Sequence, residues 1–440
     1  MTRFDLDKQD SATASAMAAV LDKLDPSHPD GPPLTGAAAD KLRALGVHNL
    51  RKANAGYALS SSPLRPPLVG DDSVVFSLYQ EAEDWYRYSA PQLAAIVRLA
   101  DLGGDDDLCW QLYAAVEPMA ASVHDLVTWG TMTPHALAAA RRSGDQAALA
   151  RTLLVAGAWH RLSGRPNAAT ACYTEAITNC VGLGPEDDLV PAALNRRGSA
   201  LLAARRLDEA EQDFVDVAAL ADGRDQVMAG LAKMNLSLVA LAGGEFARAV
   251  EVGFEADSML TFSGADPVWR LETLSQVVEA FTGSGDLAQA EEHVVRVRDL
   301  MTKARMATTH IGALIVIGQL RLAQGRHSEA LTEFLHALVL QAAGSPWRAA
   351  DISEGIARAN LGLGSTDQSV TGLQQVVAAR RKAGEPFATG RSLGLLAGVL
   401  EATGRRDEAG ECRSQALNEL AGLGDSAAAQ LRAKLIDIAN

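Results

Sequence analysis

Aromatic residues, cysteines and long apolar runs are scarce in this sequence. Only 5% of the 440 residues are aromatic, while alanine and leucine predominate. Such a mixture favours close-packed helices and fits a large β-sheet poorly. No apolar run approaches the roughly 18 residues that a membrane-spanning helix needs. We therefore predict a helical protein without a membrane span.

The four cysteines form no CxxC pair and lie within apolar helical patterns, which predicts small buried side chains. Two of them are eight residues apart, about 12 Å along a helix, too far for a disulfide. The first residues, MTRFDLDKQD, are acidic where a secretory leader would be basic and then apolar. We expect a reduced, cytoplasmic protein. The cysteines are Cys109, Cys172, Cys180 and Cys412.

Charge and motif content argue against several functions. A net charge of -14 disfavours broad adhesion to nucleic acid or anionic lipid, both of which need a cationic surface. No phosphate-binding GxxxxGK[ST] motif occurs, and the nine histidines show neither HExxH spacing nor pairing with cysteine. We predict no metal and no cofactor.

Small residues recur about every 40 positions, which decides the expected fold. Seven anchor positions, separated by 39 to 41 residues, are Gly164, Arg205, Gly244, Gly285, Gly325, Gly364 and Gly404. Five residues after each anchor stand Ala169, Ala210, Ala249, Ala290, Ala330, Ser369 and Ala409. Glycine would close a first helix in a left-handed conformation, and the small residue would let a second helix approach closely.

Larger residues follow on the same face of the second helix: Tyr173, Phe214, Val294, Phe334 and Leu373. Three positions later come Ala176, Val217, Ala256, Val297, Ala337, Val376 and Ala416. Gly157, Gly198 and Gly318 fall seven before an anchor, where the first helix must admit its partner. A 440-residue chain exceeds a single core, but a repeat array escapes that limit because each unit packs only on its neighbours.

The stretch IGALIVIGQLRLAQGRHSEALTEFLHAL, with Gly318, Gly325, Ala330, Phe334 and Ala337 at signature positions, resembles a tetratricopeptide repeat. The resemblance covers roughly residues 145–425. It implies an all-α, right-handed solenoid of about seven hairpins of about 40 residues, with degenerate N-terminal helices and a C-terminal capping helix. A period near 40 instead of the usual 34 implies extra helical turns in each pair.

A narrower likeness involves QLAAIVRLADLGGDDDLCWQLYAAVEP and ALAAARRSGDQAALARTLLVAGAWHRLSG. These segments resemble the C-terminal helical region of actinobacterial STAND-type regulators, which include the Streptomyces antibiotic regulatory proteins. In those regulators the region follows an NTPase module and tunes it. Because no NTPase motif occurs in this sequence, nucleotide-driven switching does not carry over.

The chain divides into four expected segments. Residues 1–72 are proline-rich at two places and form either a partly disordered segment or a short helix pair. Residues 73–142 read as about four helices, with Phe76, Leu78, Tyr79, Ala82, Trp85 and Tyr86 along one face. Residues 143–424 form the seven repeats. Residues 425–440 form a capping helix, begun by Asp425, whose Leu431, Leu435 and Ile438 cover the last repeat.

The concave groove is the leading candidate site. Repeats of this kind line it with their first helices, and a bound protein or peptide is the expected partner; a homodimer is left open. The acidic residues between two cationic ends favour a basic ligand segment in the fourth and sixth repeats. The groove residues are Arg151, Arg161, Asn195, Ser199, Asn235, Glu272, Ser275, Glu279, Gln319, Asp351, Glu354, Arg358 and Arg391, with Glu401 in the same register.

Asn195 and Asn235 are one period of 40 apart. Their amides either hold the backbone of an extended ligand or bridge adjacent helices, and the sequence leaves both readings open. The leading function is a non-catalytic binding scaffold or sensor with a regulatory role.

Two other functions remain as alternatives. Gly46 could make a turn between two short helices in residues 35–58, giving a DNA-binding transcription regulator; nucleic acid is the less favoured partner because the segment is near neutral and lacks a third helix. The basic residues of this stretch are Lys41, Arg43, Arg51 and Lys52. Ser392 matches the text of a GxSxG nucleophile motif, but it lies in an expected helix without the preceding strand the motif needs. We therefore predict that the protein is not an enzyme.

Overall fold

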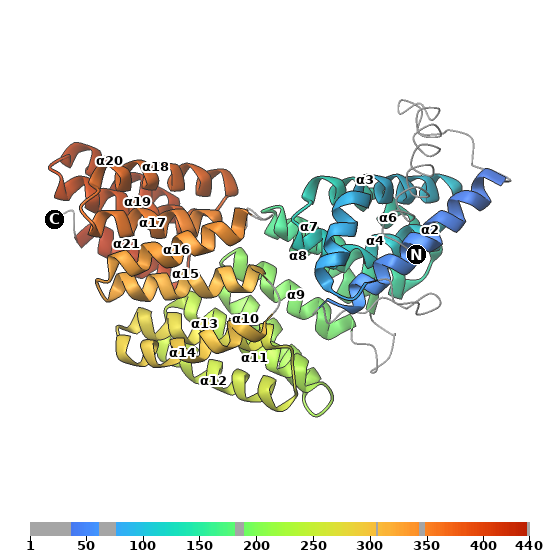
Figure 1. The fold of residues 1–440 in the computed structure, drawn as a ribbon, viewed down its shortest axis with the longest axis horizontal. Helices are drawn as coiled ribbons and strands as arrows, with labels where there is room; N and C mark the ends of the chain where they lie inside the picture. The colour runs from blue at the N-terminus through green and yellow to red at the C-terminus, as the bar shows by residue number, and fades with distance from the viewer. Residues whose placement is uncertain (1–36, 61–75, 181–188, 305–306, 343–347, 438–440) are drawn as a thin grey trace. The chain divides into compact units, whose positions relative to one another are not determined.

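The computed structural model describes residues 37–60, 76–180, 189–304, 307–342 and 348–437. The chain forms two compact units, residues 1–163 with 171–190 and residues 164–170 with 191–440. Every element of the described ranges is a helix (Figure 1). The all-α prediction is confirmed.

Unit 1 holds the N-terminal helices. Aspartates cap three of them: Asp105, Asp125 and Asp145 accept hydrogen bonds from the backbone N–H of Leu108, Thr128 and Ala147, which those helix ends would otherwise leave unpaired. The helices are α2 (Ala37–Ala58), α3 (Tyr79–Gly103), α4 (Asp106–Ala115), α5 (Glu117–Ser122), α6 (Leu126–Ser143), α7 (Gln146–Leu162) and α8 (Pro166–Cys180), the last shared with unit 2.

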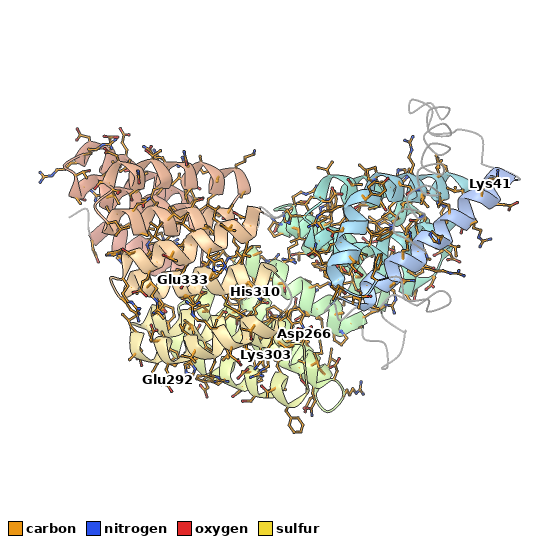
Figure 2. All side chains as sticks on the ribbon, viewed as in Figure 1. Lys41, Asp266, Glu292, Lys303, His310 and Glu333 are labelled. Carbon is orange, nitrogen blue, oxygen red and sulfur yellow. The ribbon has the colours of Figure 1, made fainter. Side chains whose placement is uncertain are left out.

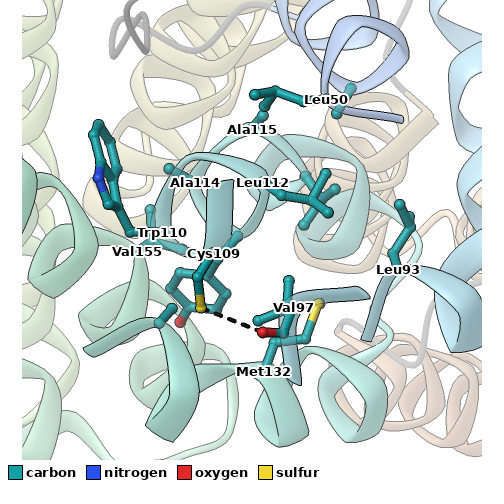
Figure 3. Packing of buried hydrophobic residues seen from close by; sticks show 14 of the residues in the cluster. Leu50, Leu93, Val97, Cys109, Trp110, Leu112, Ala114, Ala115, Met132 and Val155 are labelled. Carbon is teal, nitrogen blue, oxygen red and sulfur yellow. Dashed lines mark hydrogen bonds between the residues drawn. The ribbon is translucent and has the colours of Figure 1, made fainter. Parts of the chain in front are cut away.

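The core of unit 1 lies between α3, α4 and α6. Leu93, Leu112 and Met132 from these helices are all fully buried (Figure 3). The Cys109 thiol donates a hydrogen bond of 3.4 Å to the Val97 carbonyl (Figure 3). Cys109 and Cys180 are buried as predicted, whereas Cys172 and Cys412 are only half-buried. Leu78 departs from its predicted apolar face and is 53% exposed, because the helix starts one residue later.

The predicted break at Gly46 is wrong. Residues 37–58 form one continuous helix, α2, with Gly46 in its middle. A Cβ there would lie 2.4 Å from Leu108 Cδ2 of α4, so the glycine serves close helix packing. Arg43 lies beside Asp105 at 3.2 Å, while Lys41 is exposed (Figure 2). No helix–turn–helix forms in the described part of residues 35–58.

The contacts also place α7 in unit 1, where it packs on α4, α5 and α6. The predicted division between residues 142 and 143 therefore falls inside unit 1. Residues 1–36 and 61–72 of the expected N-terminal segment, and Ile438 of the capping helix, lie outside the described residues.

The described residues of unit 2 form six successive hairpins and a last helix, which follow one another along the chain in Figure 1. The first helices of the hairpins are α9 (Leu189–Ala203), α11 (Gln226–Gly243), α13 (Pro267–Ser284), α15 (Ala307–Ala323), α17 (Ala349–Gly362) and α19 (Pro386–Ala402). The second helices are α10 (Leu207–Ala221), α12 (Phe246–Phe262), α14 (Leu287–Lys303), α16 (His327–Ala342), α18 (Thr366–Ala383) and α20 (Arg406–Leu420). The chain continues into α21 (Ser426–Asp437).

All seven predicted anchors are hairpin turns with positive φ, from 60° at Arg205 to 85° at Gly285. Arg205 adopts this conformation without being a glycine, which is uncommon for a residue with a Cβ. The small residues five positions later, Ala169 to Ala409, are all 0% exposed. The tetratricopeptide-like register read from the sequence is therefore confirmed residue by residue.

In the middle of unit 2, first helices lie closer together than second helices. Consecutive first helices α11, α13, α15 and α17 contact one another directly, whereas α12 and α14, or α14 and α16, have no comparable backbone proximity in the described ranges. Long side chains such as Arg298 and Glu333 bridge the second helices instead. A stack whose first helices are closer together than its second helices must curve with the first helices inside. We call the surface that they turn away from the second helices the inner face.

The two ends of unit 2 meet. Asp425 caps α21 through the N–H of Ala428 at 3.0 Å and also accepts two hydrogen bonds from Arg205 of the α9–α10 turn, 220 positions away. The Arg205 guanidinium lies 4.0 Å from the centroid of the Phe387 ring of α19. Ser426 donates to the Gly243 carbonyl at 2.7 Å. The curved stack therefore closes on itself at these contacts.

One helix, α11, is long and apolar enough to cross a membrane by length and composition, but 67% of it is buried inside the protein. It packs between α10 and α12. A core helix of a globular unit passes the same test, so this feature is explained by packing.

Glycine positions give a paired test of the helix contacts. Gly355 of α17 faces Phe334, and a Cβ would lie 2.3 Å from its ring; we expect Gly355→Ala to destabilise the protein by about 1–3 kcal/mol through overpacking. Gly398 of α19 is exposed, and a Cβ there would meet nothing within 4 Å, so Gly398→Ala should stabilise by about 0.5–1 kcal/mol. Urea denaturation measures both; equal effects of the same sign would refute the packing role of Gly355.

Candidate functional site

The predicted site residues of unit 2 lie on first helices, where Asn235, Ser275 and Glu354 are buried. Asn195 and Ser199 lie on α9, Asn235 on α11, and Gln319 on α15. Glu272, Ser275 and Glu279 lie on α13, Asp351, Glu354 and Arg358 on α17, and Arg391 on α19. Arg151, half-buried, and Arg161, exposed, lie on α7 in unit 1. The prediction therefore spans two units.

Two of the amides meet. The Asn235 Nδ2 donates to the Asn195 Oδ1 at 2.8 Å, and Asn235 is 8% exposed. This contact matches the reading in which the asparagines bridge adjacent helices. It leaves the Asn195 Nδ2 and the Asn235 Oδ1 without a partner in this pair.

Gln276 extends this row onto α13 and was missed from the sequence. It follows Asn235 by 41 residues, so the period alone would have found it. Gln276 is 5% exposed, and neither its Oε1 nor its Nε2 has a hydrogen-bond partner. Its spacing with Glu272, Ser275 and Glu279 is that of one helix face. A buried amide left unpaired costs about 1–3 kcal/mol.

The predicted serines are internally satisfied. The Ser199 hydroxyl donates to the Asn195 carbonyl at 2.9 Å, and the Ser275 hydroxyl donates to the Leu271 carbonyl at 2.7 Å. Both bonds run four residues back along the same helix, so these hydroxyls keep only acceptor capacity for a ligand.

Arginines converge on the carboxylates of α17. Asp351 Oδ2 lies 2.9 Å from Arg348 Nε, and Asp351 Oδ1 lies 2.8 Å from Arg380 Nη2. Glu354 lies 3.1 Å from Arg380 and 3.3 Å from Arg391, and it accepts the Ser392 hydroxyl at 2.6 Å. Arg380, with a side chain 1% exposed, comes from the end of α18. We call Arg348, Asp351, Glu354, Arg358, Arg380 and Arg391 the arginine cluster.

The cluster changes the expected charge of the sixth repeat. Asp351 and Glu354, predicted to attract a basic ligand segment, are already paired with arginines. Burial opposes ionisation of Asp351, but Arg348 and Arg380 outweigh it and hold the pKa of Asp351 below its ordinary value. Asp351 and Glu354 are therefore not free to attract the basic ligand segment that the sequence predicts for this repeat. Arg380 could not be found from the sequence register because it lies on a second helix, outside the positions that the register covers.

One acidic residue of the fourth repeat, Glu279, is unpaired among the described residues. Glu279 has no hydrogen-bond partner among the described residues, and burial raises its pKa, although Arg348 and Arg391 act in the opposite direction. Glu279 of α13 thus lies within electrostatic reach of α17 and α19, which are two and three hairpins further along the chain. Such proximity requires the inner face to curve strongly.

Arg358 is a positively charged side chain of α17 that is likewise unpaired among the described residues. No ion pair or hydrogen bond joins it to any described residue; burial lowers its pKa, as does the neighbouring Arg391, while Glu354 raises it. The Nε of Arg391 is also buried without a partner. Glu401, read in the same register, instead pairs with Arg413 of α20.

Ser392 lies in α19 with a side chain that is 0% exposed. Its hydroxyl is bonded to a carboxylate and lies 3.0 Å from the Ala388 carbonyl, so it is inaccessible as a nucleophile. The described residues hold no group of three or more histidine, cysteine, aspartate or glutamate side chains placed to bind a metal.

Some known proteins are similar to this chain in sequence or in fold. No family model matches the chain. The regulatory protein AfsR of Streptomyces griseus is 26% identical over 330 residues, which are 74% of this chain and 32% of AfsR. The chain thus spans about a third of the length of that relative. This similarity agrees with the resemblance to Streptomyces regulators seen in the sequence.

Solved structures share the fold at low identity. A Rap protein complexed with Competence and Sporulation Factor superposes with a TM-score of 0.60 at 10% identity, covering 87% of this chain and 98% of that one. The Rap conjugation gene regulator of plasmid pLS20, in complex with the Phr* peptide, gives 0.56 at 11%, covering 76% and 96%. Aspartyl phosphate phosphatase F from Bacillus subtilis gives 0.54 at 11%, covering 80% and 96%. The fold is a tetratricopeptide-like solenoid.

Proposed function

We propose that this protein is a non-catalytic, cytoplasmic regulator whose inner face binds a peptide or an extended segment of a partner protein. The observation that carries the proposal is the buried, unpartnered amide of Gln276 on the first helix α13, one repeat period after Asn235. A peptide group offers one donor and one acceptor, so an extended ligand would satisfy this amide once the covered Gln276 side chain turns toward it.

Unpaired charge on the same face supports the proposal. Buried polar groups are nearly always hydrogen-bonded in native proteins, and exceptions call for an explanation. Gln276 is such an exception, and Glu279 and Arg358 are half-buried charged side chains on first helices without a hydrogen-bond partner among the described residues. Two structures of the same fold were solved with Competence and Sporulation Factor and with the Phr* peptide, and AfsR is a regulatory protein; both observations favour a regulatory peptide-binding role.

A random-peptide display library, selected on the purified full chain, tests the proposal. We expect enriched peptides whose binding falls at least tenfold in the Glu272→Lys/Glu279→Lys variant. The matched control is Glu251→Lys/Glu292→Lys, which makes the same charge change at exposed positions of α12 and α14; Glu292 is labelled in Figure 2. Control binding should stay within twofold of the unsubstituted chain.

A second variant separates binding from folding. Gln276→Leu removes the unpaired amide, so thermal stability should hold or rise while peptide binding weakens. The proposal is rejected if no peptide is enriched, or if enriched peptides bind the inner-face and control variants equally well.

A further inference from the structure

Two arginines with unfilled donors, Arg358 and Arg391, lie on α17 and α19, the first helices of the last two hairpins. The guanidinium of Arg358 carries five N–H donors and has no partner in the described part of the chain. The buried Nε of Arg391 has no acceptor. Arg358 and Arg391 are also close enough to repel each other electrostatically.

The nearest carboxylate cannot satisfy them. Glu354 is 4% exposed, and its two oxygens already serve Arg380, Arg391 and the Ser392 hydroxyl. Asp351 is occupied by Arg348 and Arg380. Glu279 and Glu385 lie within electrostatic reach of Arg391 but make no hydrogen bond with it in the described ranges. The donors of Arg358 and the Nε of Arg391 are therefore left unfilled by the carboxylates around them in the described ranges.

Planar guanidinium groups with free N–H donors bind carboxylate and phosphate oxygens through paired, charge-assisted hydrogen bonds. An anion between two arginines would also remove their mutual repulsion. Arg358 and Arg391 lie on consecutive first helices. Arg391 pairs with Glu354, and Glu354 in turn accepts a hydrogen bond from the Ser392 hydroxyl, so one of the two guanidiniums is already held in place.

We propose that Arg358 and Arg391 form a subsite for an anionic group, a carboxylate or a phosphate, carried by the ligand of the inner face. The subsite rests on the proposed function and refines it, since it requires an acidic group on a ligand that the sequence alone predicts to be basic. Glu279 of α13, which lies within electrostatic reach of Arg391, disfavours a second acidic group beside it, so the acidic group defines the direction of the bound ligand.

Inorganic phosphate is the first probe. At constant ionic strength, replacing chloride with phosphate should raise the midpoint of thermal unfolding of the full chain in a saturable way, because a ligand that binds only the native state stabilises it. Arg358→Gln removes a guanidinium that makes no hydrogen bond or ion pair with any described residue, so the variant should fold normally. It should nevertheless lose the phosphate-induced rise in the unfolding midpoint. Arg406→Gln, an exposed arginine at the start of α20, should keep it.

Peptides distinguish the sources of the anion. Each library-selected peptide is compared with a free C-terminal carboxylate, a C-terminal amide, acidic side chains replaced by their amides, and a phosphoserine in place of an acidic residue. We expect affinity to fall roughly 10- to 100-fold when the recognised anion is removed, the loss of one charge-assisted contact. Arg358→Gln should abolish the difference between the charged and neutral forms, and Arg358→Lys should restore only part of it.

Two results overturn the subsite. One is a phosphate-induced shift that is absent from the unsubstituted chain or equal in Arg358→Gln. The other is a set of peptides that bind Arg358→Gln as tightly as the unsubstituted chain. If those peptides still lose binding in Glu272→Lys/Glu279→Lys, the anionic subsite fails while the proposed function stands.

Discussion

Phe334→Ala is expected to lower the free energy of unfolding by about 3–5 kcal/mol, the range for deleting a fully buried aromatic side chain. The Phe334 ring is 0% exposed and lies between two glycines, one from each neighbouring first helix. A Cβ at Gly318 would lie 2.8 Å from the ring, and one at Gly355 only 2.3 Å. Both helices therefore pack around this ring and cannot collapse onto a smaller side chain.

Urea denaturation followed by far-UV circular dichroism measures the effect. Val339→Ala is the control because Val339 lies on the same helix but is 70% exposed; its cost should stay within about 0.5 kcal/mol. A cost below about 1 kcal/mol for Phe334→Ala would show that α15, α16 and α17 do not depend on this ring for their packing.

Arg205→Gln is expected to open the junction between the two ends of unit 2. The side chains of Arg205 and Asp425 are 14% and 5% exposed, and removing one partner leaves a buried charge uncompensated, which costs about 3–5 kcal/mol. The variant also loses the contact with the Phe387 ring and the bond to the Ala242 carbonyl. We expect the amides of α21 to exchange with solvent much faster while those of unit 1 stay unchanged.

Arg405→Gln is the matched control, since Arg405 also lies in a hairpin connection, directly after Gly404, but pairs with Glu408 across an exposed surface, at 41% and 51% exposure. Exposed pairs contribute about 0–1 kcal/mol, so α21 should keep its protection. Unchanged exchange of α21 in Arg205→Gln would mean that the junction is held by other contacts.

Acid should open the same junction. Burial opposes ionisation of Asp425, but the hydrogen bonds from Arg205 and from the Ala428 N–H prevail and hold the pKa of Asp425 below its ordinary value of 3.8. Because the folded pKa is depressed, this contribution to stability is present above the ordinary pKa and is lost as the pH falls through the folded pKa. Exchange of α21 amides measured below about pH 4 should therefore rise more steeply in the unsubstituted chain than in Arg205→Gln.

The sequence by itself determined the repeat. A hairpin turn needs a left-handed residue and a close helix approach needs a small one, and both requirements are local, so Gly244, Gly285 and Gly325 could be placed from spacing alone. The same logic failed at Gly46, because a glycine that ends a helix and a glycine that lets another helix approach look identical in sequence. Only the presence of Leu108 of α4 beside it decides between them.

Tertiary structure decided the chemistry of the inner face. Whether Glu354 and Glu279 carry free charge depends on which arginines reach them, and Arg380 comes from a second helix that the register of the first helices does not include. The meeting of Arg205 with Asp425 depends on the accumulated curvature of all the intervening hairpins. Side-chain pairing over such separations is set by small rotations added from repeat to repeat, which no local pattern in the sequence records.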